Sequence, residues 1–230
     1  MSQEAAIIGT TFISSIARFA VTAQPGIFLH ILRDSAAKLA GTLGASSPDE
    51  AFVIAAKKLV QLFCERFENM ASRHRRRLVA LALVTLLEDA EPASNNGQDA
   101  FLYEAIPEMV TPWTEVLEDE KERAEPRDGR ARPPSPLDAI GDDIEDAEWL
   151  DDGGVDGAVL PETARWSALR ETDPARSGAF ASQLSRVLGI AQAKAPELFN
   201  AAMARVDPLV LDILTGALQA LSAGGAIASS

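Results

Sequence analysis

The chain has 230 residues, of which 47% are hydrophobic and 24% charged, and this composition excludes a chain that is disordered throughout. Lysine and arginine number 21 against 34 aspartate and glutamate residues, so the net charge is −13. A surface this acidic argues against nucleic acid and favours protein partners, some of them basic. The single cysteine, Cys64, cannot form an internal disulfide, the apolar runs are about half the length of a bilayer span, and the N-terminus lacks the basic flank of a signal peptide. We therefore expect a soluble intracellular protein with no membrane insertion.

Apolar residues near the N-terminus recur at intervals of three and four, which predicts a helix over residues 4–22. Pro25-Gly26 ends this helix, and the same period then predicts a second helix that ends near Gly44. The repeating positions of the first helix are Ile7, Ile8, Phe12, Ile16, Phe19 and Ala20.

A strong helix start follows at Ser47-Pro48-Asp49-Glu50, with serine as N-cap, proline as the first helical residue and glutamate placed to reach back to the cap amide. The apolar period continues over residues 52–70. After a polar break, residues 78–87 are apolar nearly all round, as in a helix packed between neighbours. A further helix is expected over about 98–117, interrupted or kinked by two prolines. These segments predict antiparallel helix pairs in series.

Composition changes abruptly near Glu115. Residues 115–156 hold 16 acidic and 5 basic residues together with several prolines and glycines, which predicts a disordered loop over residues 119–162. Trp149-Leu150 within it is either a short docking helix or an exposed pair of residues. The acidic spacing does not match a calcium-binding EF-hand, so the loop either keeps the chain soluble or attracts a basic protein partner electrostatically. The candidate contacts for such a partner are Asp142, Asp143, Glu145 and Asp146.

Order is expected to return near Thr163, with three more helices before the end of the chain. Asp207 should cap the last of them, with Pro208 as its first residue. No stretch alternates with a period of two for long enough to predict a sheet, so the fold class is all-α. Helix pairs of about 40 residues in series favour a HEAT-like α-solenoid over the rival four-helix bundle. The predicted domains are helical repeats at 1–118, the acidic loop at 119–162, a C-terminal helical repeat or cap at 163–223 and a flexible tail at 224–230.

The one basic cluster of the sequence lies where one helix ends and the next begins. It is either an exposed turn, whose cations complement a helix C-terminus, or a contact for an acidic partner or for the chain's own acidic loop. Its candidate partner-binding residues are Arg73, Arg75, Arg76 and Arg77.

Catalytic chemistry has no candidate residues in this sequence. The two histidines, His30 and His74, have no cysteine or carboxylate at ligand spacing. A phosphate-binding glycine loop, a nucleophile elbow and an HExxH pattern are absent. We therefore expect no enzyme activity, no cofactor and no metal site.

The stretch Phe67–Leu87 ends a long helix in a polar turn and then places basic residues before a Leu-Ala-Leu-rich helix. In this it resembles the late HEAT repeats of importin-11-like nuclear transport receptors, which belong to the importin-β superfamily. Residues 16–28 look like the preceding repeat. The closing segment of the family is resembled by Ala168–Pro174, Phe199 and Val206-Asp207. The likeness spans about residues 8–118 and 165–221, and the proline-rich loop is not matched.

The resemblance implies a non-enzymatic carrier that binds protein cargo, crosses the nuclear pore through the Phe-Gly repeats of nucleoporins and releases cargo when Ran-GTP binds, and that therefore shuttles between nucleus and cytoplasm. The N-terminal part that engages Ran-GTP in this superfamily has no counterpart here, so the resemblance further implies the C-terminal end of a receptor. Such a fragment would begin without a polar cap, which predicts self-association when it is expressed alone. The alternatives are a stand-alone helical-repeat scaffold or adaptor, which would hold its partner regardless of Ran, and an enzyme with a cryptic site.

Overall fold

The computed structural model describes residues 3–92, 97–124, 173 and 179–225, and every regular element within them is a helix. The predicted all-α fold is thereby confirmed. None of these helices combines the length and the apolar character that crossing a membrane requires. The elements are α1 (Gln3–Thr22), α2 (Ile27–Lys38), α3 (Ala40–Leu43), α4 (Pro48–Phe67), α5 (Arg73–Asp89), α6 (Ala100–Glu104), α7 (Ile106–Ala124), α10 (Phe180–Lys194), α11 (Pro196–Met203) and α12 (Pro208–Gly225).

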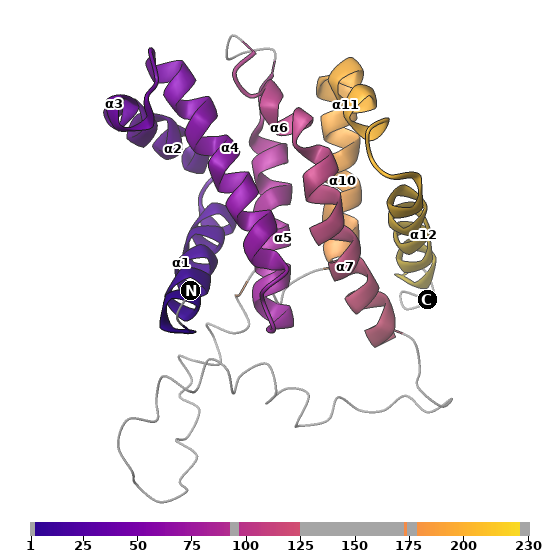
Figure 1. The fold of residues 1–230 in the computed structure, drawn as a ribbon. Helices are drawn as coiled ribbons and strands as arrows, with labels where there is room; N and C mark the ends of the chain where they lie inside the picture. Colours follow the sequence, from indigo (N-terminus) through magenta and orange to yellow (C-terminus); the bar gives the residue numbers. More distant parts are fainter. Residues whose placement is uncertain (1–2, 93–96, 125–172, 174–178, 226–230) are drawn as a thin grey trace, which may run out of the picture.

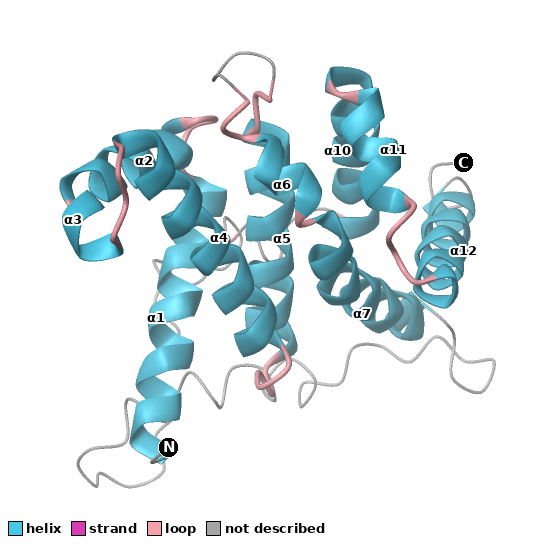
Figure 2. Cartoon of the chain, turned by 45° about the horizontal axis from the view of Figure 1, so that its top comes forward, coloured by secondary structure: helices cyan, strands magenta, loops and turns pink. Residues whose placement is uncertain are grey.

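The helices lie side by side in a row that begins with α1, α2 and α3 and ends with α12, so the first and last helices lie at opposite ends of the row (Figure 1). Helix α5 occupies the centre and packs against α1, α4, α7 and α10. At the far end α12 packs against α7 and α10. The turned view keeps the same order, with α2 and α3 folded over the start of α4 (Figure 2). This is the layered arrangement of a helical-repeat solenoid, in which each layer contacts only its neighbours.

The central position of α5 explains its sequence. Residues 78–84, 86 and 87 of this helix are all buried, which matches the apolar character predicted nearly all round. Aromatic side chains from neighbouring helices complete the core, and their polar atoms have partners: Trp113 Nε1 donates to the Ala80 carbonyl at 3.3 Å, and Tyr103 Oη donates to the Ala191 carbonyl at 3.4 Å. The core therefore runs continuously from α1 to α12.

The start of α4 follows its sequence signature with one change. Ser47 is the N-cap, and its side chain accepts a hydrogen bond from the Glu50 amide at 3.1 Å. The Glu50 carboxylate, however, accepts from the amide of Ser46 at 2.7 Å and from the Ser46 hydroxyl, not from the amide of the cap itself. The reciprocal bond of the capping box is therefore displaced by one residue, which lowers the pKa of Glu50 through the hydrogen bonds from Ser46.

Two predicted helices are each divided in the structure. The second breaks at Leu39, whose backbone leaves the helical region, so that α2 and the short α3 replace one helix. The helix predicted over 98–117 breaks at Ala105 into α6 and α7. Pro107 lies in the first turn of α7, where its missing N–H costs nothing, and the buried Pro112 lies inside that helix.

The predicted loop boundary at residue 118 is wrong by six residues, because α7 continues to Ala124. Residues 119–122 are charged, but three of these side chains form ion pairs with α5 and therefore belong to the folded part. The C-terminal helix likewise extends to Gly225, two residues into the predicted tail. Residues 125–162, most of the predicted loop, lie outside the described residues.

Only part of the apolar stripe predicted for the first helix is buried in the structure. Ile13, Ala17 and Ala20 face the core, whereas Phe12 and Phe19 are 61% and 45% exposed. The period of the apolar residues was correct, but it does not distinguish a face that meets α5 from a face that points away from it.

Candidate functional site

The basic cluster lies in the first two turns of α5, after the N-cap Ser72, whose side chain accepts from the Arg75 amide. The prediction that these cations complement a helix C-terminus is therefore wrong. At a helix N-terminus the backbone dipole disfavours positive charge, so the arginines need carboxylates nearby.

Helix α7 supplies those carboxylates. Glu115, Asp119 and Glu122 recur at intervals of four and three and so share one face of α7. Arg73 Nε lies 3.7 Å from Asp119 Oδ1, and its Nη2 lies 3.7 Å from Glu122 Oε2. Arg76 forms an ion pair with Glu115, lies 3.9 Å from Asp119 and places its guanidinium 5.0 Å from the centre of the Phe67 ring.

The most buried pair of this interface joins three helices. Arg77 Nη1 lies 3.0 Å from Glu120 Oε1, and both side chains are only 15% exposed. The two oxygens of Glu120 also accept from the amides of Phe180 and Ala181, at 3.2 and 3.4 Å. Glu120 therefore caps α10, which has no side-chain cap of its own, while it neutralises Arg77.

A second carboxylate reaches the same region from beyond the acidic segment. Asp173 is buried, and its Oδ2 lies 3.0 Å from Arg18 Nη1 of α1 and 3.3 Å from His74 Nε2 of α5. Asp173, which follows the acidic segment in the sequence, thus lies at the junction of α1 and α5. His74, which the sequence placed in a basic turn, is a helical residue that contributes to this junction.

The predicted site residues therefore have different outcomes. Three of the four arginines pair with acidic residues of helix α7, and Arg75 is half-buried beside them, while a contact with the acidic loop or with an acidic partner stays a prediction. The acidic partner residues lie in α7 and at position 173, and the sequence analysis missed them. Their signal was the interval of four and three residues from Glu115 to Glu122, which continues the helix past the predicted boundary. The other four candidates, Asp142, Asp143, Glu145 and Asp146, lie outside the described residues.

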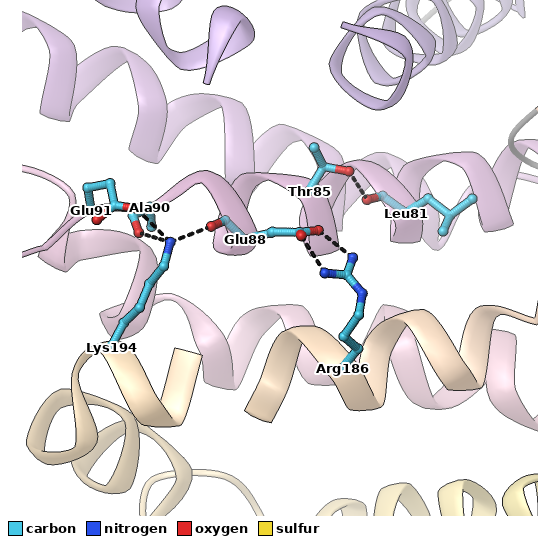
Figure 3. A network of polar contacts seen from close by, with 7 residues as sticks. All are labelled: Leu81, Thr85, Glu88, Ala90, Glu91, Arg186 and Lys194. Carbon is cyan, nitrogen blue, oxygen red and sulfur yellow. Dashed lines mark hydrogen bonds and ion pairs between the residues drawn. The ribbon is translucent and has the colours of Figure 1, made fainter. Parts of the chain in front are cut away.

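Polar contacts also join α5 to α10 at the opposite end of α5 (Figure 3). The guanidinium of Arg186 donates to both oxygens of Glu88, at 2.6 and 2.8 Å. The ammonium of Lys194 donates to the Glu88 and Ala90 carbonyls, at 2.8 and 3.2 Å, and to the Glu91 carboxylate at 2.7 Å. Lys194 thereby satisfies carbonyl groups at the end of α5, where positive charge is favoured.

An open groove of about 590 Å³ lies between α10 and α12. Its apolar lining includes Leu188, Met203, Leu211, Leu214 and Leu218, and serine, threonine and glutamine side chains complete it. Arg186 is the one charged lining residue, and it is bonded to Glu88. The groove therefore suits an uncharged, apolar segment.

Large exposed apolar side chains gather at the two ends of the row. Within the described residues none of them lies on α4, α5, α6, α7 or α10. One group belongs to α1–α3 or adjoins it, and the other to α11 and α12. The exposed residues are Phe12, Phe19, Ile27, Ile31, Leu39, Leu198, Leu209 and Ile213.

The described residues contain no group of three or more histidine, cysteine and carboxylate side chains that could hold a metal ion. His30 lies 3.6 Å from Asp34 on the same helix, and both are largely exposed. The thiol of Cys64 lies 3.5 Å from the Glu108 carbonyl, and desolvation raises its pKa to about 12, so it is far from a reactive thiolate at neutral pH.

The comparisons with known proteins agree with this architecture. No curated protein and no solved structure matches the chain significantly. A family profile described as "Importin-11-like, TPR repeats" matches residues 2–219, and the description implies a transport receptor type, which is not an enzyme family. The helical-repeat fold and the match over almost the whole chain lead to one conclusion: the chain belongs to the importin-11-like family.

Proposed function

We propose that this chain is the C-terminal part of a nuclear import receptor that binds protein cargo and carries it through the nuclear pore in a Ran-dependent cycle. The family match over residues 2–219 carries the proposal. The solenoid fits it physically, because small rotations between successive layers add up to a large change of an extended binding surface. In this function the protein shuttles between cytoplasm and nucleus.

The charges of the chain favour a basic cargo. Arg73, Arg76 and Arg77 all pair with carboxylates of α7, and the side chain of Arg73 is the most exposed of the three, at 45%. Asp142, Asp143, Glu145 and Asp146 belong to a segment with a large excess of acidic residues. We assign these four residues to the contact with a basic cargo, and we assign Arg73 and Arg75 to any acidic part of the same cargo.

The groove between α10 and α12 is the surface that we assign to nucleoporin repeats. Phe-Gly repeats are uncharged and offer single aromatic side chains. The groove is mainly apolar, and Arg186, the charged residue among its described lining, is paired with Glu88. A Phe-Gly peptide should bind, and a Ser-Gly peptide of the same length should not. Leu188→Asp in the groove should abolish binding, whereas Leu209→Asp on the outer side of α12 should leave it intact.

Ran dependence separates a receptor from a scaffold. The tagged protein, isolated from cells at its natural length, is bound to its partners and then treated with Ran loaded with GTP or with GDP. Release by Ran-GTP alone supports the import function. Partners that stay bound in both nucleotide states would establish the alternative, a helical-repeat scaffold or adaptor. Charge reversal at residues 142, 143, 145 and 146 in the same experiment tests the cargo contact, since loss of no partner would exclude it.

A further inference from the structure

Helix α1 exposes two phenylalanines beside the face that packs on the core, and the ring of Phe19 also contacts the buried Phe28 of α2, with 5.8 Å between the ring centres. Phe12 and Phe19 are 61% and 45% exposed, and the exposed Ser15 lies between them. A spacing of seven residues, at about 100° per residue, places the two rings on one face, two turns apart. We call Phe12, Ser15 and Phe19 the α1 stripe.

Two arginines flank the α1 stripe. The guanidinium carbon of Arg66 lies 3.6 Å from the position that a Cβ on Gly9 would occupy, and Gly9 is three residues, almost one turn, before Phe12. Arg66 has no ion pair within the part of the chain that the structure describes. Arg18 lies on the other flank of the stripe, where it bonds to Asp173. An occupant of the α1 stripe is therefore favoured by apolar side chains with negative charge beside them, most strongly next to Arg66, because Arg18 is already paired with Asp173.

One segment of this chain has that composition. Trp149-Leu150 is preceded by Glu148 and followed by Asp151-Asp152, and residues 138–156 hold nine acidic and no basic side chains. This segment lies outside the described residues, so its match to the α1 stripe is one of sequence: an apolar pair between negative charges against an apolar stripe between positive charges.

The position of Asp173 brings the segment within reach. Asp173 is fixed to Arg18, and 24 residues separate it from Trp149. A chain of this length spans at most about 80 Å, and its typical end-to-end distance is about 27 Å. Phe12 lies six residues from Arg18 along α1, a distance of about 9 Å. The tether therefore holds the segment near the α1 stripe at an effective concentration of the order of millimolar.

We propose that Trp149-Leu150 docks on the α1 stripe, with its acidic neighbours against Arg66 and Arg18. The acidic segment then covers the apolar face that the first helix exposes. A partner that binds the acidic segment must compete with this intramolecular contact. The contact thereby lowers the accessibility of the acidic segment to that partner. The inference does not depend on a transport function.

Photo-crosslinking in the full-length chain tests the proposal. Phe12 is replaced by benzoylphenylalanine, and adducts are located by mass spectrometry after irradiation. We expect an adduct within residues 140–156 of the same chain. The matched control places the same photo-reactive residue at Leu209, which is 73% exposed at the opposite end of the row and should give no such adduct.

Two variants and one change of salt concentration sharpen the result. Trp149→Ala combined with Leu150→Ala should reduce the adduct at least about tenfold, as expected when an aromatic anchor is lost. Arg66→Gln should reduce it less, and 500 mM salt should reduce it in the parent chain because the flanking charges are screened. Circular dichroism verifies that each variant remains helical. An adduct to a second copy of the chain, an adduct elsewhere or no adduct would each overturn the proposal, as would an adduct that the Trp149→Ala, Leu150→Ala variant retains.

Discussion

The start of α5 and the outer face of α1 lie close together, since His74 and Arg18 both pair with Asp173. The two regions differ in how far their side chains are satisfied by contacts within the protein. At the start of α5, arginines at a helix N-terminus are neutralised by carboxylates from α7, and Asp173 pairs with His74 of the same turn and with Arg18 of α1. On α1, two phenylalanines remain exposed. The basic cluster, which the sequence suggested as an exposed turn, thus contributes to packing between helices. The apolar repeat of α1, which suggested a buried face, is in part exposed.

The largest difference is expected between an interior and an outward phenylalanine. Phe63 is fully buried on α4, and Phe63→Ala should lower the free energy of unfolding by about 3–5 kcal/mol, because it leaves a cavity. Phe12→Ala, at a side chain that is 61% exposed, should change it by less than about 1 kcal/mol. Urea unfolding followed by circular dichroism measures both. Equal losses would mean that the α1 stripe belongs to the core.

The ion pair between Arg77 and Glu120 is the next test. Glu120→Ala leaves Arg77, whose side chain is 15% exposed, without this carboxylate and removes the cap of α10, so we expect a loss of about 3 kcal/mol in the free energy of unfolding. Glu118, an exposed residue of the same helix, is the matched control, and Glu118→Ala should change stability by about 0.5 kcal/mol or less. Equal stability of the two variants would show that the ion pair between Arg77 and Glu120 contributes no more to stability than an exposed charge on the same helix.

A helix cap should have a smaller effect. Ser47→Ala removes the acceptor for the Glu50 amide and should cost about 1 kcal/mol. Ser46→Ala is the informative companion, because the Ser46 amide would still donate to Glu50 while the bond from its hydroxyl is lost. A smaller loss for Ser46→Ala would show that the backbone bond maintains the displaced capping box. A loss equal to that of Ser47→Ala would show that the hydroxyl of Ser46 contributes as much to stability as the N-cap does.

The sequence predicted what local periodicity and capping decide. The helix start at Ser47, the buried character of residues 78–87 and the cap at Asp207, which accepts from the Leu209 amide at 2.8 Å, were all available from neighbouring residues. The partners of the arginines were not, because Arg77 and Glu120 are 43 residues apart and their contact depends on how α5 and α7 pack. Which face of α1 is buried depends on α5 in the same way. Asp173 is still further from Arg18, and only the folded chain brings them together.

Carboxylates stabilise the arginines at the start of α5, whereas a different set of carboxylates opposes ionisation of the Cys64 thiol. Desolvation and the carboxylates of Glu108, Glu68 and Glu65 raise the pKa of this thiol to about 12 from an ordinary value of 9.0. Since the unfolded thiol loses its proton first as the pH rises above 9, deprotonation favours the unfolded chain between pH 9 and 12, and stability should fall over that range. At pH 8 the folded thiol should react with a disulfide reagent at least about a hundredfold more slowly than the thiol of the urea-unfolded chain, because only the thiolate attacks. Rapid labelling of the folded chain would show that α4 and α7 open locally at Cys64. The contact between these helices would then resemble the exposed face of α1 and not the ion-paired start of α5.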